Sequence, residues 1–142
     1  MTRFLVVAFV LLTSISYAQK TVDKDKDRIN GVCDSFMKLF VESKPHDALQ
    51  LLKQNTVISE STIDTLEVTI DNQIRDYFPA YGTMLSYEFA VEKKLKDFIA
   101  KRFYILKFDK FYLKFDFTLY KAPTGWTVTN FNYNEELGEL FN

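Results

Sequence analysis

Few side chains in this sequence are of the types that perform nucleophilic or metal chemistry. The 142 residues include one histidine, His46, and one cysteine, Cys33. Nucleophilic catalysis needs a nucleophile beside an oriented base, and a zinc site needs several clustered ligands. The sequence contains no GxGxxG, phosphate-binding loop, HExxH or paired-cysteine spacing. We therefore predict no catalytic residue, no metal site and no cofactor, and we expect His46 to be exposed and isolated.

Two charged residues occupy positions that the apolar pattern directs toward the interior. Glu67 lies about 40° from Ile63 around the same predicted helix, and Arg102 lies on the inward side of a predicted strand. A buried charge needs a partner. In one interpretation Glu67 and Arg102 pair and only stabilise the fold. In the other, Arg102 lines a pocket with Tyr87 and Tyr104 and binds a carboxylate or phosphate through its fork of donors.

Three helices are predicted to precede these strands. An apolar stripe of helical period begins at Ile29 and includes Cys33, so we expect that thiol to be buried. Pro45 suits the first turn of a short second helix. Ser61 is the predicted N-cap of a third helix, which Pro79 ends.

Beyond Gly82 the apolar period alternates, which predicts a sheet. Turns at residues 96–97 and 109–110 give two hairpin registers that agree, because both place the same apolar set on one face. A third turn at residues 122–125 and a β-bulge near residues 129–130 complete four strands. The predicted cross-strand pairs include Val91 with Arg102, Phe89 with Tyr104, Leu106 with Leu113, and Trp126 with Leu119.

The order of three helices and four antiparallel strands predicts an α+β domain, with the helices packed on one face of a curved sheet. The long first helix, the short second helix behind Pro45 and the closing strand GWTVTNFNY resemble the nuclear transport factor 2-like superfamily within the cystatin-like folds. The resemblance covers about residues 26 to 134 and rests on element order and pattern. It implies a cone with an internal pocket, where enzymes of the family place an Asp with a His or Tyr. No His or Asp of this sequence matches that pattern.

The beginning of the chain is typical of a cleavable secretory signal. Residues 1–18 carry one cation, Arg3, then an apolar run that is shorter than the roughly twenty residues of a bilayer span. We expect no stable membrane span, cleavage at Ala18-Gln19, and a periplasmic or extracellular location. Residues 19–28 are predicted to be a charged leader, and residues 29–142 a single domain. A lone cysteine allows no internal disulfide, so the domain is expected to depend on core packing.

The outward face of the predicted sheet combines lysines with Phe103, Ile105 and Tyr112. One interpretation is a solvated face that lysines protect from aggregation. The other is association of two copies through this face, which would bury the three apolar residues in a homodimer, as the family resemblance implies. Nucleic acid is not an expected partner, because an exported domain seldom meets any.

Three classes of function follow from these observations. We expect an exported, non-enzymatic domain that binds a small or anionic ligand, or a protein partner, through the cone pocket or the basic sheet face. One alternative is an enzyme that acts on a small hydrophobic substrate through Glu67 and a tyrosine. Another is a structural accessory protein of the envelope. An open tyrosine-lined cavity that reaches Arg102 would favour binding or catalysis. A cavity filled by side chains would favour a structural protein.

Overall fold

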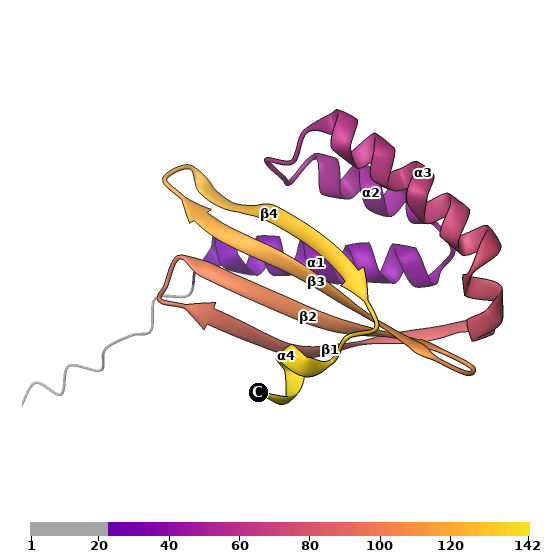
Figure 1. The fold of residues 1–142 in the computed structure, drawn as a ribbon. Helices are drawn as coiled ribbons and strands as arrows, with labels where there is room; N and C mark the ends of the chain where they lie inside the picture. The colour runs from indigo at the N-terminus through magenta and orange to yellow at the C-terminus, as the bar shows by residue number, and fades with distance from the viewer. Residues whose placement is uncertain (1–22) are drawn as a thin grey trace, which may run out of the picture.

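The structure is a computed structural model that describes residues 23–142. It is an α+β domain, as predicted, in which helices precede a single sheet of four antiparallel strands (Figure 1). The predicted signal peptide and its cleavage point lie outside the described residues. No helix within residues 23–142 is long and apolar enough to cross a membrane. The elements are α1 (Lys24–Val41), α2 (Pro45–Lys53), α3 (Glu60–Asp76), the 3-10 turn η1 (Phe78–Tyr81), β1 (Met84–Leu95), β2 (Ile99–Phe108), β3 (Tyr112–Ala122), β4 (Gly125–Asn134) and α4 (Gly138–Phe141).

Helix α1 begins at Lys24, before the predicted start at Ile29, so the last part of the charged leader is helical. Asp23 is the N-cap, and its carboxylate accepts a hydrogen bond from the backbone N–H of Lys26 at 3.1 Å. Alternating charges conceal this first part of the helix, because the apolar period becomes visible only at Ile29. The earlier start places Lys26 in the folded domain.

Of the other two predicted helix starts, one is confirmed and one is wrong. Helix α2 has Pro45 in its first turn, as predicted. Helix α3 is capped by Ser59 and not by Ser61, because the Ser59 hydroxyl accepts from the backbone N–H of Thr62 at 3.3 Å. Ser61 lies inside the first turn.

The β2–β3 hairpin has the predicted register throughout. In the β3–β4 hairpin Leu119 pairs with Val128 and not with Trp126, because the strands close at Ala122 and Gly125 and this register places Trp126 opposite Lys121. The predicted bulge is confirmed: the register shifts where Thr129 has no partner of its own. The bulge returns Phe131 to the inner face, where it packs against the core.

The β1–β2 hairpin departs from the predicted register near its tip. Phe89 lies opposite Tyr104, as predicted, but beyond an irregularity after Phe89 the residue opposite Arg102 is Glu92 and not Val91. The cause is a longer loop, with Lys96 in the left-handed region at φ 57°. This shift places a carboxylate beside the buried arginine.

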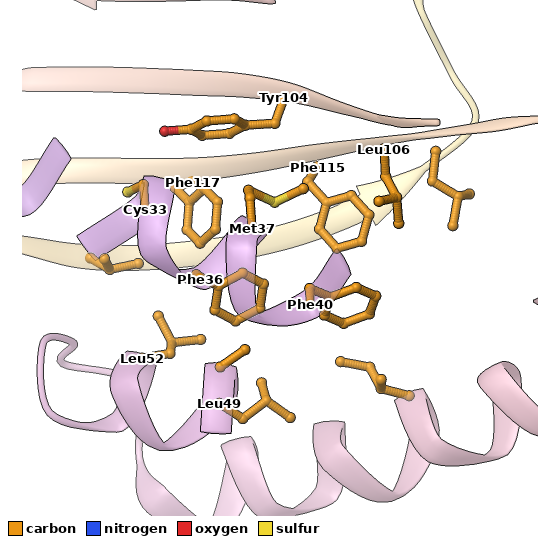
Figure 2. Packing of buried hydrophobic residues seen from close by; sticks show 14 of the residues in the cluster. Cys33, Phe36, Met37, Phe40, Leu49, Leu52, Tyr104, Leu106, Phe115 and Phe117 are labelled. Atoms are coloured by element: carbon orange, nitrogen blue, oxygen red, sulfur yellow. The ribbon is translucent and has the colours of Figure 1, made fainter. Parts of the chain in front are cut away.

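The core lies between α1 and the inner face of the sheet. The ring of Phe36 is 5.2 Å from that of Phe117, and the ring of Phe40 is 5.2 Å from that of Phe115. Figure 2 shows these rings between the strands and the leucines of α2, including Leu49. Helix α1 therefore packs directly on the sheet, and α2 packs on α1.

Cys33 is buried in this core, as predicted. Burial raises the pKa of its thiol to about 12. A thiol in that state is protonated at neutral pH and is a poor nucleophile. Its role in the folded domain is that of a small apolar side chain.

Candidate functional site

Three of the four predicted ligand-binding residues lie together on the inner face of β1 and β2. Arg102 is only 8% exposed, and its Nε donates a hydrogen bond to the Tyr104 hydroxyl at 3.1 Å. The ring of Tyr87 lies 6.2 Å from the ring of Tyr104. Phe89 completes the group, because the guanidinium carbon of Arg102 stands 4.4 Å from the centre of its ring.

The fourth residue, Glu67, lies elsewhere, so the predicted pairing of Glu67 with Arg102 is wrong. The Glu67 carboxylate on α3 is hydrogen-bonded to Nδ1 of His46 on α2. Helix α3 packs against α2, which brings an acid at the edge of its apolar stripe to the first turn of that helix. His46 is exposed, as predicted, but it is not isolated.

The partner of Arg102 is Glu92. One oxygen of this carboxylate, Oε1, accepts from Lys26 Nζ at 2.5 Å and from Arg102 Nη1 at 3.2 Å. Lys26 also donates to Asn30 Oδ1 at 2.6 Å. Burial opposes ionisation of Glu92, but the hydrogen bond and charge of Lys26, together with those of Arg102, lower the pKa of Glu92 below its ordinary value. Glu92 is therefore an anion between two cations at neutral pH.

Asp34 completes the set of acceptors around Arg102. Its Oδ1 accepts from the Tyr104 hydroxyl and lies 3.5 Å from Arg102 Nη2. Burial and the hydrogen bond to Asp34 raise the pKa of Tyr104, so its hydroxyl remains protonated. Each of the three guanidinium nitrogens thus has an acceptor within the chain. This arrangement supports the structural interpretation of Arg102, with Glu92 in the place predicted for Glu67.

Sequence reasoning missed Lys26, Asp34 and Glu92. Lys26, Asn30 and Asp34 follow one another at intervals of four residues along α1, which is a signal of one polar row on a helix. The row is visible only if the helix is taken to begin before Ile29. Glu92 gives no such signal, because its position depends on the irregularity in β1.

An open pocket of about 310 Å³ is bordered by the end of α3, by η1 and by residues of β3 and β4. Figure 1 shows α3 leading into β1 at one end of the sheet. None of the predicted residues Arg102, Tyr87, Tyr104 and Glu67 lines it. Aromatic rings form much of its wall. The lining residues are Gln73, Tyr77, Phe78, Tyr81, Leu113, Tyr133, Asn134 and Glu135.

Packing within the protein holds the wall of this pocket in place. The ring of Tyr81 lies 5.9 Å from that of Phe78 and 5.4 Å from that of Phe108. The Tyr133 hydroxyl donates to the side-chain oxygen of Gln73, which joins β4 to α3. Burial raises the pKa of Tyr133, so this donor is retained at neutral pH. Tyr77 stands at the rim and is 64% exposed.

A sequence signal for this pocket exists in the run YFPAYG at residues 77–82. Three aromatic residues surround Pro79, which lies in η1 just after α3 ends at Asp76. Such a run interrupts the helix. Its rings differ in burial, because Phe78 belongs to the core, Tyr81 packs against the core and Tyr77 is exposed. The predicted site residues were inward-facing polar residues of the strands and Glu67 of a helix, so they did not include this run.

A smaller pocket of about 190 Å³ is bordered by the tips of the hairpins and the start of α1. Four lysines line it, which would suit the predicted anionic ligand. Three of them are already close to acids. Lys26 and Lys94 are both paired with Glu92, and Lys121 Nζ lies 3.5 Å from Asp23. Its positive charge is correspondingly reduced.

The outward sheet face is more covered than predicted, and the expectation that Phe103 is exposed is wrong. Phe103 is fully buried beneath the ammonium groups of Lys101 and Lys114, which lie 5.3 and 5.7 Å from its ring. Ile105 and Tyr112 are half-buried. Association of two copies through this face stays a prediction, in which Phe103 would play no direct part.

The C-terminal segment contributes to this cover. Helix α4 lies against the side of the sheet near β1 and β2 (Figure 1). Glu139 of α4 accepts from Lys101 Nζ at 2.9 Å, and the backbone oxygen of Asn142 accepts from Lys93 Nζ at 3.1 Å. Lys101, one of the lysines that were expected to protect a bare sheet, thus contacts the end of the chain together with Lys93.

Asp116 lies on this covered face as an incompletely paired acid. It is 1% exposed, its Oδ1 has no hydrogen-bond partner among the described residues, and Lys101 Nζ is 3.9 Å away. Burial raises the pKa of Asp116 although Lys101 and Lys114 oppose the shift; Glu139 adds to it. The acid therefore ionises more readily in the unfolded chain than in the folded one.

We expect Asp116→Asn to gain stability relative to the wild type as the pH rises from 3 to 7. An acid whose pKa is raised by folding loses stability between its unfolded pKa and its folded pKa, and the amide has no such loss. The expected relative gain is about 1 kcal/mol, the lower range for an unsatisfied buried polar group. Urea unfolding across this pH range measures it, with the exposed Asp97→Asn as control. If the free energies of unfolding of Asp116→Asn and the wild type changed in parallel with pH, folding would not raise the pKa of Asp116.

Comparisons with protein-family models, with curated proteins and with solved structures returned no match. The resemblance to the nuclear transport factor 2-like superfamily accordingly stays a prediction. Within residues 23–142, no group of three or more His, Cys, Asp or Glu side chains is arranged to hold a metal ion.

Proposed function

We propose that this domain binds a small molecule in the open pocket lined by Tyr77, Phe78, Tyr81 and Tyr133. The observation that carries the proposal is the aromatic wall, which is packed in place before any ligand arrives. Ligand sites are typically concave and largely apolar, with a few polar groups that fix orientation. Here Gln73, Asn134 and Glu135 supply those polar groups.

Binding is better supported than catalysis. The enzyme hypothesis required Glu67 beside a tyrosine of the cavity, and Glu67 bonds His46 instead. Acid–base catalysis also needs a group whose pKa lies near the working pH. The raised pKa of Tyr133 moves its hydroxyl away from that range.

The proposal extends to location and family. Export to the periplasm or outside the cell is supported by the signal-like residues 1–18. A cone of the nuclear transport factor 2-like type is supported by the order of helices and strands and by the packing of α1 on the sheet. In such a cone the pocket lined by Tyr77, Phe78, Tyr81 and Tyr133 would lie at the open end. Ile105 and Tyr112 would be the residues available for a homodimer.

The pocket is tested by filling it. N-phenyl-1-naphthylamine is an uncharged probe whose fluorescence rises in an apolar site. We expect Leu113→Trp, which replaces a leucine side chain of the pocket wall with a bulkier indole ring, to weaken binding of this probe at least about tenfold, because it removes the space that the probe would occupy.

The matched control is Leu95→Trp at an exposed leucine near the tip of the β1–β2 hairpin, which is not among the pocket residues. It should bind the probe as the wild type does. Circular dichroism establishes that both variants are folded. Equal binding by wild type and folded Leu113→Trp would refute the proposal, as would a wild type that binds no probe.

A further inference from the structure

The charge of the aromatic pocket is negative. Among the described residues that line it, Glu135, which is exposed, is the one charged residue, and no lysine or arginine lines it. This contrasts with the pocket near the hairpin tips, where four lysines gather. A ligand that uses the charge of the aromatic pocket must therefore be positive, and the charge of Glu135 would repel an anion.

The aromatic rings favour the same charge. The face of an aromatic ring carries negative potential and attracts a cation, most strongly when water is excluded. Tyr77, Phe78 and Tyr81 supply rings from the α3–η1 segment, and Tyr133 supplies one from β4. Rings from two separate segments can therefore contact one bound group on different sides.

We infer that the pocket binds a small organic cation of the quaternary or tertiary ammonium class. This inference rests on the proposed function, because it names the ligand class of the same pocket. The alkyl groups of such a cation contact the rings, and its charge is balanced by Glu135. The volume of about 310 Å³ is at the small end for ligand pockets, which restricts the substituent on the ammonium group.

Other ligand classes fit the lining less well. A metal ion needs several oxygen ligands, whereas Glu135 is the only carboxylate among the described residues that line the pocket. A sugar needs many free hydrogen-bonding groups, and the oxygen of Gln73 is already occupied by the Tyr133 hydroxyl. A quaternary ammonium ion carries no N–H group and therefore needs no hydrogen-bond acceptor.

The test compares choline with 3,3-dimethyl-1-butanol, an uncharged molecule of nearly the same shape. Isothermal titration calorimetry is expected to show choline binding about tenfold more tightly, with the difference shrinking in high salt because the charge of Glu135 is screened. Tetramethylammonium and benzyltrimethylammonium are then tested for displacement of N-phenyl-1-naphthylamine. Equal affinities for choline and its isostere would overturn the inference.

Two matched pairs of variants locate the effect. Tyr77→Ala and Glu135→Gln are each expected to weaken choline binding about threefold to tenfold, while the isostere responds little to Glu135→Gln. Tyr120→Ala and Glu136→Gln change an exposed tyrosine and an exposed acid outside the lining, and both should leave choline binding unchanged.

The outcomes separate the inference from the proposed function. If the uncharged probe binds and Leu113→Trp abolishes its binding, but none of the three ammonium compounds binds or displaces it, the pocket remains a ligand site and the cation inference fails. If neither the probe nor any ammonium compound binds the wild type, both fail. Choline binding that responds to Tyr77→Ala and Glu135→Gln supports both.

Discussion

Replacing Phe36 with alanine is expected to lower the free energy of unfolding by about 4 kcal/mol. Phe36 is almost fully buried, and its ring lies 5.2 Å from that of Phe117 and 4.9 Å from that of Phe131. These rings belong to α1, β3 and β4, so the substitution opens a cavity where the helix meets two strands. Figure 2 shows Phe36 and Phe117 at this place. The surrounding rings are fixed by their own contacts and can close the cavity only in part.

Urea unfolding at pH 7 measures this loss, and Phe141→Ala is the matched control. Phe141 lies in the C-terminal helix and is 81% exposed, so its truncation is expected to change the free energy of unfolding by less than about 0.5 kcal/mol. A loss below about 1 kcal/mol for Phe36→Ala would mean that the core between α1 and the sheet is not packed as described.

The parts of the fold that could be predicted are those with a local period. The apolar stripe that contains Phe36 and Cys33 fixes the buried face of α1, and alternation beyond Gly82 fixes the faces of β2 and β3. The bulge near Thr129 could also be predicted, because strict alternation would have directed Phe131 to solvent. In each case a pattern within a few neighbouring residues carries the information.

The parts that could not be predicted depend on contacts between distant segments. The identity of the acid beside Arg102 changes with one extra residue in β1, and no residue type near Phe89 marks that irregularity. Phe103 has the alternation of an exposed position, yet lysines and the end of the chain cover that face. The aromatic pocket likewise joins segments far apart in sequence, so neither Tyr81 nor Tyr133 alone indicates it.

Substitution of Glu92, the acid beside Arg102, has the second largest expected effect on the free energy of unfolding. We expect Glu92→Gln to lower the free energy of unfolding by about 3 kcal/mol at pH 7, because it leaves the charges of Lys26 and Arg102 buried without their shared carboxylate. The matched control is Glu88→Gln on the same strand. Glu88 pairs with Lys107 at 2.9 Å on the surface, so its loss should cost less than about 1 kcal/mol.

The pH dependence distinguishes a lost charge from lost packing. Because folding lowers the pKa of Glu92, its stabilisation is fully present above its ordinary unfolded pKa and is lost as the pH falls through the lower folded pKa. The difference in stability between wild type and Glu92→Gln should therefore shrink as the pH falls from 7 to 3. A difference that stays constant over this range would show that the glutamine disturbs packing, and that the carboxylate between Lys26 and Arg102 contributes no stability as an anion.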